Sequence, residues 1–145
     1  ARAVSIKFTD TQLPDALIMG SDQTVKKEEK ILGKPGSLDA AIQQLQLLQS
    51  QTVIFYSAVA MLDTQNNSVQ KQVIETTVRY RNLSDAQIAA YLERDKPFDC
   101  AGSFKSEALG ITILESVRSD DPTALVGLPL IALTTMLSNA GLAPL

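Results

Sequence analysis

Charged side chains on three segments of this 145-residue sequence form a pattern that suits phosphate chemistry. Asp22 follows the apolar run at residues 16–19, and Lys34 lies in a Gly-Lys-Pro-Gly segment. Lys105 and Glu107 lie close together on a third segment. Lysine donates to phosphate oxygens as a point charge, and magnesium binds one or two carboxylates together with substrate phosphates. A carboxylate can also take a proton from an attacking water. This set therefore predicts a site for a phosphate substrate and a divalent cation.

Each of these residues also has a purely structural interpretation, which residue types and spacing leave open. An aspartate after a strand is often a turn former or a helix N-cap. Lys34, beside glycine and proline, fits an exposed loop. Lys105 and Glu107 fit a surface ion pair, which would contribute little to stability. Residue types and spacing alone thus indicate an α/β domain with possible phosphate binding.

The composition excludes several classes of function. The sequence has no histidine, so a Ser-His-Asp or Cys-His nucleophile and a histidine-based zinc site are excluded within this chain. Any general base must be a carboxylate, lysine, tyrosine or cysteine. The net charge of -3 disfavours nucleic acid as a partner, and no apolar run is long enough to cross a membrane. The single cysteine, Cys100, cannot form an internal disulfide, which favours the cytoplasm.

The elements that position these side chains follow from local patterns. Residues 16–19 resemble a buried strand that ends in a tight turn at residues 20–23. Ser37 is a predicted N-cap of a helix that ends near Ser50. Residues 52–62 and 69–81 form a predicted antiparallel hairpin, and a capping box begins a second helix at Ser84. Residues 100–110 resemble a loop, residues 111–114 a strand, and residues 127–129 the start of a final helix with a buried stripe of Leu130, Leu133 and Leu137. One α/β domain is the simplest architecture.

Five motifs, in this order, closely resemble the Maf family of nucleotide pyrophosphatases over essentially the whole chain. They are Gly-Ser-Asp-Gln at residues 20–23, Leu-Gly-Lys-Pro at 32–35, Tyr-Arg-Asn-Leu-Ser at 80–84, Ala-Gly-Ser-Phe-Lys-Ser-Glu at 101–107 and Val-Gly-Leu-Pro-Leu at 126–130. Any one motif is weak, but five in order are specific. The fourth motif, with Gln23, resembles the subgroup that hydrolyses 7-methyl-GTP, whereas the dTTP and UTP pyrophosphatase subgroup carries a different loop.

The resemblance implies a single Maf-like domain over residues 1–145, with a mixed, highly curved sheet flanked by helices. It implies hydrolysis of a nucleoside triphosphate to the monophosphate and pyrophosphate with a divalent metal (Mg, Mn or Co), and a homodimer. Asp22 occupies the position of the proton acceptor and is also a candidate metal ligand. Lys34 and Lys105 occupy positions near the phosphates. Ser21 belongs to the substrate-binding set, in which Gln23 and Glu107 set the base preference.

The sequence departs from the family at its beginning. The family starts with a strand and a phosphate-binding Ser-Pro-x-Arg-Arg-type loop, neither of which is present here, and this chain is expected to begin inside the following helix. Residues 1–145 alone are therefore expected to have little activity. Two other functions stay open: a pyrophosphatase for UTP or dTTP, and a non-catalytic regulatory protein of cell division on the same fold.

Overall fold

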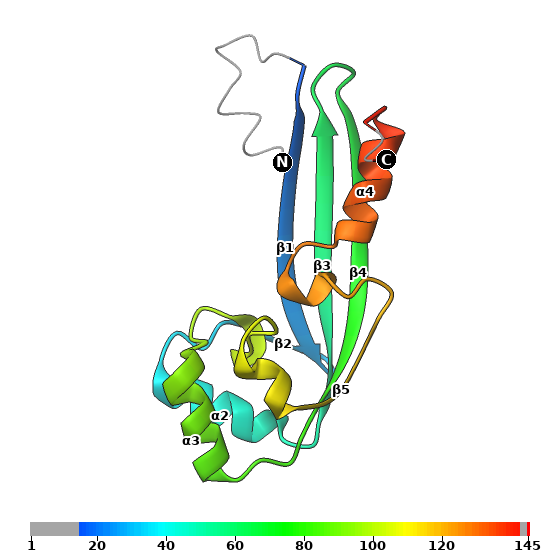
Figure 1. Ribbon diagram of the computed structural model, residues 1–145. Helices are drawn as coiled ribbons and strands as arrows, with labels where there is room; N and C mark the ends of the chain where they lie inside the picture. Colours follow the sequence, from blue (N-terminus) through cyan, green and yellow to red (C-terminus); the bar gives the residue numbers. More distant parts are fainter. Residues whose placement is uncertain (1–14, 143–144) are drawn as a thin grey trace. The chain divides into compact units, whose positions relative to one another are not determined.

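The computed structural model describes residues 15–142 and residue 145 (Figure 1). The helix expected at the very start of the sequence lies outside the described residues. The strands are β1 Leu17–Lys27, β2 Lys30–Leu32, β3 Thr52–Asp63, β4 Ser68–Tyr80 and β5 Leu114–Ser119. The helices are α2 Leu38–Leu48, α3 Asp85–Asp95 and α4 Leu130–Asn139, and the short 3-10 helices are η1 Ala101–Ser103, η2 Leu109–Ile113 and η3 Ala124–Val126.

The strands form one sheet in the order β2-β1-β3-β4-β5. Strand β1 pairs antiparallel with β2, and Val25 lies opposite Leu32. Strand β4 pairs antiparallel with β5, and Val78 lies opposite Val117. The predicted α/β class is confirmed. Both pairings are antiparallel, where the resemblance implies a mixed sheet. For β1 and β2 the reason is the short turn between them, since a parallel pair needs a long crossover.

The predicted turn at residues 20–23 is wrong, because β1 continues to Lys27 and its end pairs with β2. Pairing with a neighbouring strand outweighs the local turn preference of Gly20. This segment is also only partly buried, with Val25 as its fully buried residue. The strand predicted at residues 111–114 is likewise displaced, since a 3-10 helix occupies residues 109–113 and β5 follows it.

The chain divides into two compact units. The first contains the described residues up to Asp22, together with Ser57–Ile74 and the segment from Asp121 onward. In this unit α4 lies along β3 and β4 (Figure 1). The predicted hairpin link is confirmed: the Asp63 carboxylate accepts hydrogen bonds from Gln65 N (2.9 Å) and Asn66 Nδ2 (2.8 Å). The core of the unit consists of Val59, Met61, Ile74, Ala124, Ala132, Leu133 and Met136.

The buried face of α4 differs from the predicted one. Leu133 is buried as expected, but Leu130 is 46% exposed and Leu137 is only partly buried. Ala132 and Met136 take their places in the core. The face that meets the core is centred on Ala132, Leu133 and Met136, so Leu137 lies at its edge, and Leu130 lies in the exposed first turn of α4.

The second unit contains Gln23–Tyr56 and Glu75–Asp120. In it α2 packs against α3 and η1. The ring of Phe104 makes edge contacts with Phe55 (5.9 Å between centroids) and Tyr80 (6.5 Å). Both predicted helix starts are confirmed, since Ser37 accepts a hydrogen bond from Ala40 N and Ser84 forms a complete capping box. In neither unit is any described helix long and apolar enough to cross a membrane.

Candidate active site

The first unit carries Ser21 and Asp22 on β1, and both side chains are exposed. The Ser21 hydroxyl lies 2.8 Å from the carbonyl oxygen of Ala58 and 2.6 Å from that of Gly127. Its single proton is thus engaged with the backbone of β3 and of the loop before α4. Ser21 therefore ties that loop to the sheet beside Asp22. Its expected place in substrate binding stays a prediction.

The start of α4 is capped by the side chain of Asp121, which precedes η3 in the chain. The Asp121 carboxylate accepts hydrogen bonds from Ile131 N (2.7 Å), Thr123 N (3.0 Å) and the Thr123 hydroxyl (2.6 Å). The Thr123 hydroxyl in turn accepts from Leu130 N (2.8 Å). Although burial opposes its ionisation, these bonds hold the pKa of Asp121 below its usual value. The first amides of α4 are already satisfied, which argues against an anion site at this helix start.

In the second unit, Gln23 is half-buried on β1 and Lys34 is exposed on the loop between β2 and α2. This loop is held from both sides. Gln44 Nε2 donates to Gly33 O (3.1 Å), and Gly36 N donates to the carbonyl of Phe98 (2.9 Å). Gly36 has a φ of 75°, a left-handed conformation that glycine adopts without strain. The Lys34 ammonium is thus carried on a fixed backbone while its own end faces solvent.

Lys105 and Glu107 lie on the loop that follows η1. Lys105 is half-buried, and its Nζ donates to the backbone carbonyl of Asp95 at 3.4 Å. Glu107 is exposed and accepts a hydrogen bond from the Ser106 hydroxyl at 3.2 Å. The salt bridges found among the described residues are Lys26–Glu29 and Arg79–Glu115. The interpretation of Lys105 and Glu107 as a surface ion pair is therefore wrong, and each charge is available for another partner.

Asp99 is an exposed carboxylate whose pKa is lowered in part by the charges of both candidate lysines, and sequence reasoning missed it. The Cys100 thiol, 3.5 Å away, and Asp99's own backbone lower the pKa of Asp99, and the positive charges of Lys105 and Lys34 lower it further. Both ammonium groups thus act on one exposed carboxylate. Asp99 directly precedes Cys100 and the fourth motif, but nothing local in the sequence predicts its proximity to Lys34. Lys34 and Lys105 thus both contribute positive potential at Asp99, whose carboxylate carries the opposite charge.

Several candidate bases are protonated at neutral pH. Burial raises the pKa of Tyr80 and Tyr91 above the ordinary tyrosine value. Burial and the neighbouring Asp99 raise the pKa of Cys100 to about 11. With histidine absent from the sequence, carboxylates and lysines are left as proton acceptors. This agrees with the expected role of Asp22.

A divalent metal ion needs oxygen or sulfur ligands from side chains or from the substrate. No cluster of three or more Asp, Glu or Cys side chains that could hold an ion occurs in residues 15–142. This argues against a preformed cage of protein ligands. Magnesium, however, commonly binds through one or two carboxylates plus substrate phosphates. The exposed carboxylate of Asp22 fits that mode of binding.

These features define an α/β protein with an exposed carboxylate on β1 and two lysines on loops of the second unit. The model of the family described as Maf-like protein matches residues 1–140. A protein of Aromatoleum aromaticum is 51% identical over 98% of this chain and 71% of its own length. One from Cupriavidus pinatubonensis is 54% identical over 88% of this chain and 64% of its own length. One from Saccharophagus degradans is 43% identical over 100% of this chain and 73% of its own length.

The chain belongs to the Maf family, as these matches show. All three relatives are named 7-methyl-GTP pyrophosphatase. The chain spans between 63% and 73% of the length of the curated relatives that it matches.

Proposed function

We propose that the protein is a nucleoside triphosphate pyrophosphatase that hydrolyses 7-methyl-GTP to 7-methyl-GMP and pyrophosphate. The observation that carries the proposal is the identity of 43–54% with relatives that bear this name, over 88–100% of the chain. The residue types agree, because Lys34 and Lys105 of the second unit can donate to phosphate oxygens. Such a reaction would remove a modified nucleotide in the cytoplasm.

In the proposed reaction, the bond between the α- and β-phosphates breaks and water supplies the oxygen of the new monophosphate. Asp22 accepts the proton of the attacking water. Lys34 and Lys105 stabilise the negative charge that develops on the phosphate oxygens. Gln23 and Glu107 recognise the base, and Ser21 keeps the loop at Gly127 beside Asp22. A divalent ion held by Asp22 and the substrate would polarise the phosphates and help to neutralise their charge.

Two other functions are tested against this one. A pyrophosphatase for UTP or dTTP would use the same phosphate chemistry with a different base preference. A regulatory protein of cell division would keep the fold but release no pyrophosphate from any nucleotide. A panel of 7-methyl-GTP, GTP, UTP and dTTP, assayed by pyrophosphate release, separates all three.

The test of the reaction uses the full natural chain and its Asp22→Asn variant with 7-methyl-GTP. Removal of a general base typically costs 10²–10⁴-fold, so kcat is expected to fall by about 100-fold or more. Asp120→Asn is the matched control, because Asp120 is exposed and undergoes the same chemical change. EDTA should abolish turnover, and Mg, Mn or Co should restore it.

Two results would contradict the proposal at different points. Absence of pyrophosphate from the folded wild-type protein would rule out the proposed reaction. Equal kcat in Asp22→Asn and wild type would leave the reaction in place but remove Asp22 from its role.

A further inference from the structure

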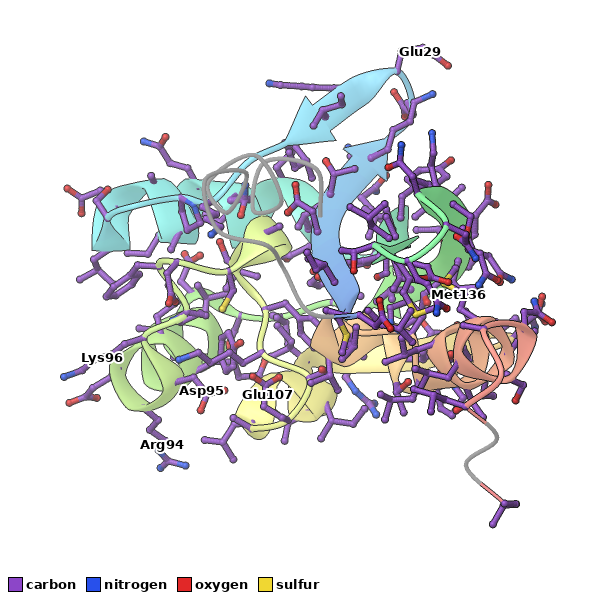
Figure 2. The ribbon with its side chains drawn as sticks, turned by 90° about the horizontal axis from the view of Figure 1, so that it is seen from above. Glu29, Arg94, Asp95, Lys96, Glu107 and Met136 are labelled. Atoms are coloured by element: carbon purple, nitrogen blue, oxygen red, sulfur yellow. The ribbon has the colours of Figure 1, made fainter. Side chains whose placement is uncertain are left out.

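Helix α3 holds Lys105 at two points one turn apart. The hydroxyl of Tyr91 accepts a hydrogen bond from Lys105 N at 3.2 Å, and the carbonyl of Asp95 accepts from Lys105 Nζ at 3.4 Å. Residues four apart lie on the same face of a helix, so one face of α3 contacts both the backbone and the side chain of Lys105. Figure 2 labels Asp95, the last residue of α3, and Glu107, which lies on the loop after η1.

The backbone carbonyl of Lys105 is fixed as well. Gly110 N donates to the carbonyl of Lys105 at 3.1 Å. A Cβ atom at Gly110 would collide with that carbonyl and come within 2.6 Å of the Phe104 ring. The backbone of Lys105 is therefore held at its N–H by Tyr91 and at its C=O by Gly110. Glu107 follows two residues later, and its position depends on that of Lys105.

The start of the loop is anchored separately from Tyr91. The Ser103 hydroxyl donates to Gln44 Oε1 at 2.6 Å, and the Tyr80 hydroxyl donates to the carbonyl of Gly102 at 3.2 Å. Ser103 itself has a φ of 54°, a conformation that non-glycine residues seldom adopt and that the surrounding contacts maintain. Loss of the Tyr91 hydroxyl should therefore loosen the loop only from Lys105 onward.

The Tyr91 side chain is more than a packing residue. The residue is 4% exposed, so its ring contributes to the core. Its hydroxyl in addition binds the backbone amide of Lys105, the residue that leads to Glu107. Burial raises the pKa of Tyr91, the bond from Lys105 N lowers it, and the negative charges of Asp95 and Glu107 raise it further. The hydroxyl thus stays neutral at neutral pH, and the hydrogen bond does not depend on pH there.

We propose that Tyr91 is a positioning residue for nucleotide selectivity. Through its bond to Lys105 N, it sets the backbone from which Lys105 reaches the phosphates and Glu107 reaches the base. The inference rests on the proposed function, since it concerns the choice between 7-methyl-GTP and GTP. The ammonium contact with Asp95 is the longer of the two, so the side chain can exchange it for a phosphate while the backbone stays in place.

The test is Tyr91→Phe in the full natural chain, which removes the hydroxyl and keeps the ring. A single hydrogen bond contributes about 0.5–1.5 kcal/mol, equivalent to a change of up to about tenfold. The ratio of kcat/KM for 7-methyl-GTP to that for GTP is expected to fall severalfold. Exchange of the Lys105 amide with solvent, measured by NMR, should accelerate by a similar factor, while the amides of α3 keep their protection. Tyr56→Phe on β3 is the matched control and should change neither quantity.

The outcomes separate the inference from the proposed function. If wild type does not hydrolyse 7-methyl-GTP, the proposed function fails first. If wild type prefers 7-methyl-GTP and Tyr91→Phe keeps the same preference, or keeps the slow exchange of the Lys105 amide, the role of Tyr91 is overturned. Should Tyr91→Phe unfold, 3-fluorotyrosine at position 91 keeps the ring and weakens the hydroxyl as an acceptor of the Lys105 N–H. The preference for 7-methyl-GTP is then expected to fall, and an unchanged preference would overturn the inference equally.

Discussion

Single side chains on the loop after η1 differ in how firmly they are held. Lys105 is bound through its N–H, its carbonyl and its ammonium group. Glu107 is exposed and accepts only the Ser106 hydroxyl among the described residues. A lysine with a fixed backbone, followed by an exposed carboxylate, suits a ligand with two different ends, the phosphates and the base. The proposed division of roles between these two residues follows from this difference.

Glu107→Gln tests the role of the carboxylate in base preference. Methylation at N7 places a positive charge on guanine, which a carboxylate favours and an amide does not, whereas both can accept hydrogen bonds from the base edge. The preference for 7-methyl-GTP over GTP, measured as a ratio of kcat/KM values, should fall by about tenfold. Glu93→Gln, an exposed exchange on α3, is the control. Matching ratios in Glu107→Gln and wild type would reject this role.

Among the elements, the α-helices differ in the residues that cap their N-termini. Ser37 and Ser84 cap α2 and α3 from the residue that directly precedes each helix. Helix α4 instead follows Pro129, which has no side chain able to cap it, and Asp121 supplies the cap from ten residues before Ile131. A buried carboxylate that accepts three hydrogen bonds therefore fixes both η3 and the start of α4.

Asp121→Asn should lower the free energy of unfolding by about 2 kcal/mol at neutral pH, because it leaves the Ile131 amide facing an amide donor. The folded-state pKa of Asp121 is depressed, so its contribution is fully present above the unfolded value of 3.8 and is lost as the pH falls through the folded value. The difference between variant and wild type in urea denaturation should thus shrink below pH 3.8. Asp120→Asn should show almost no difference at any pH, and a gap that widened in acid would contradict the assignment.

At the scale of the whole molecule, the family is established, while assembly is a proposal. The resemblance to Maf proteins implies a homodimer, and no partner chain is needed to account for the contacts of α3 with Lys105.

If the protein forms a homodimer, its midpoint of thermal unfolding should rise with protein concentration, because unfolding is then linked to dissociation. Sedimentation velocity of the full natural chain at micromolar concentration should show a species of twice the monomer mass. A single species of monomer mass, with a concentration-independent Tm, would exclude the homodimer.

Local features of the sequence were sufficient to predict several secondary-structure elements. Ser37 and Ser84 predict their helices because the cap and the amide that it binds lie three residues apart. The link at residues 63–68 predicts its hairpin because Asp63 bonds residues that directly follow it. The ordered motifs also identified the family and the candidate residues Asp22, Lys34, Lys105 and Glu107. In each case the determining groups are neighbours in the chain, or occur as a recognisable pattern along it.

Only the tertiary structure decided the setting of those residues. Asp22 lies within a strand rather than in a turn, because β1 continues beyond it to pair with β2. The charges of Lys34 and Lys105 both lower the pKa of Asp99, although more than sixty positions separate Asp99 from Lys34. Tyr91 holds the amide of Lys105 from fourteen positions away. Such contacts depend on how α2, α3 and the loops pack, and no local pattern along the sequence encodes that packing.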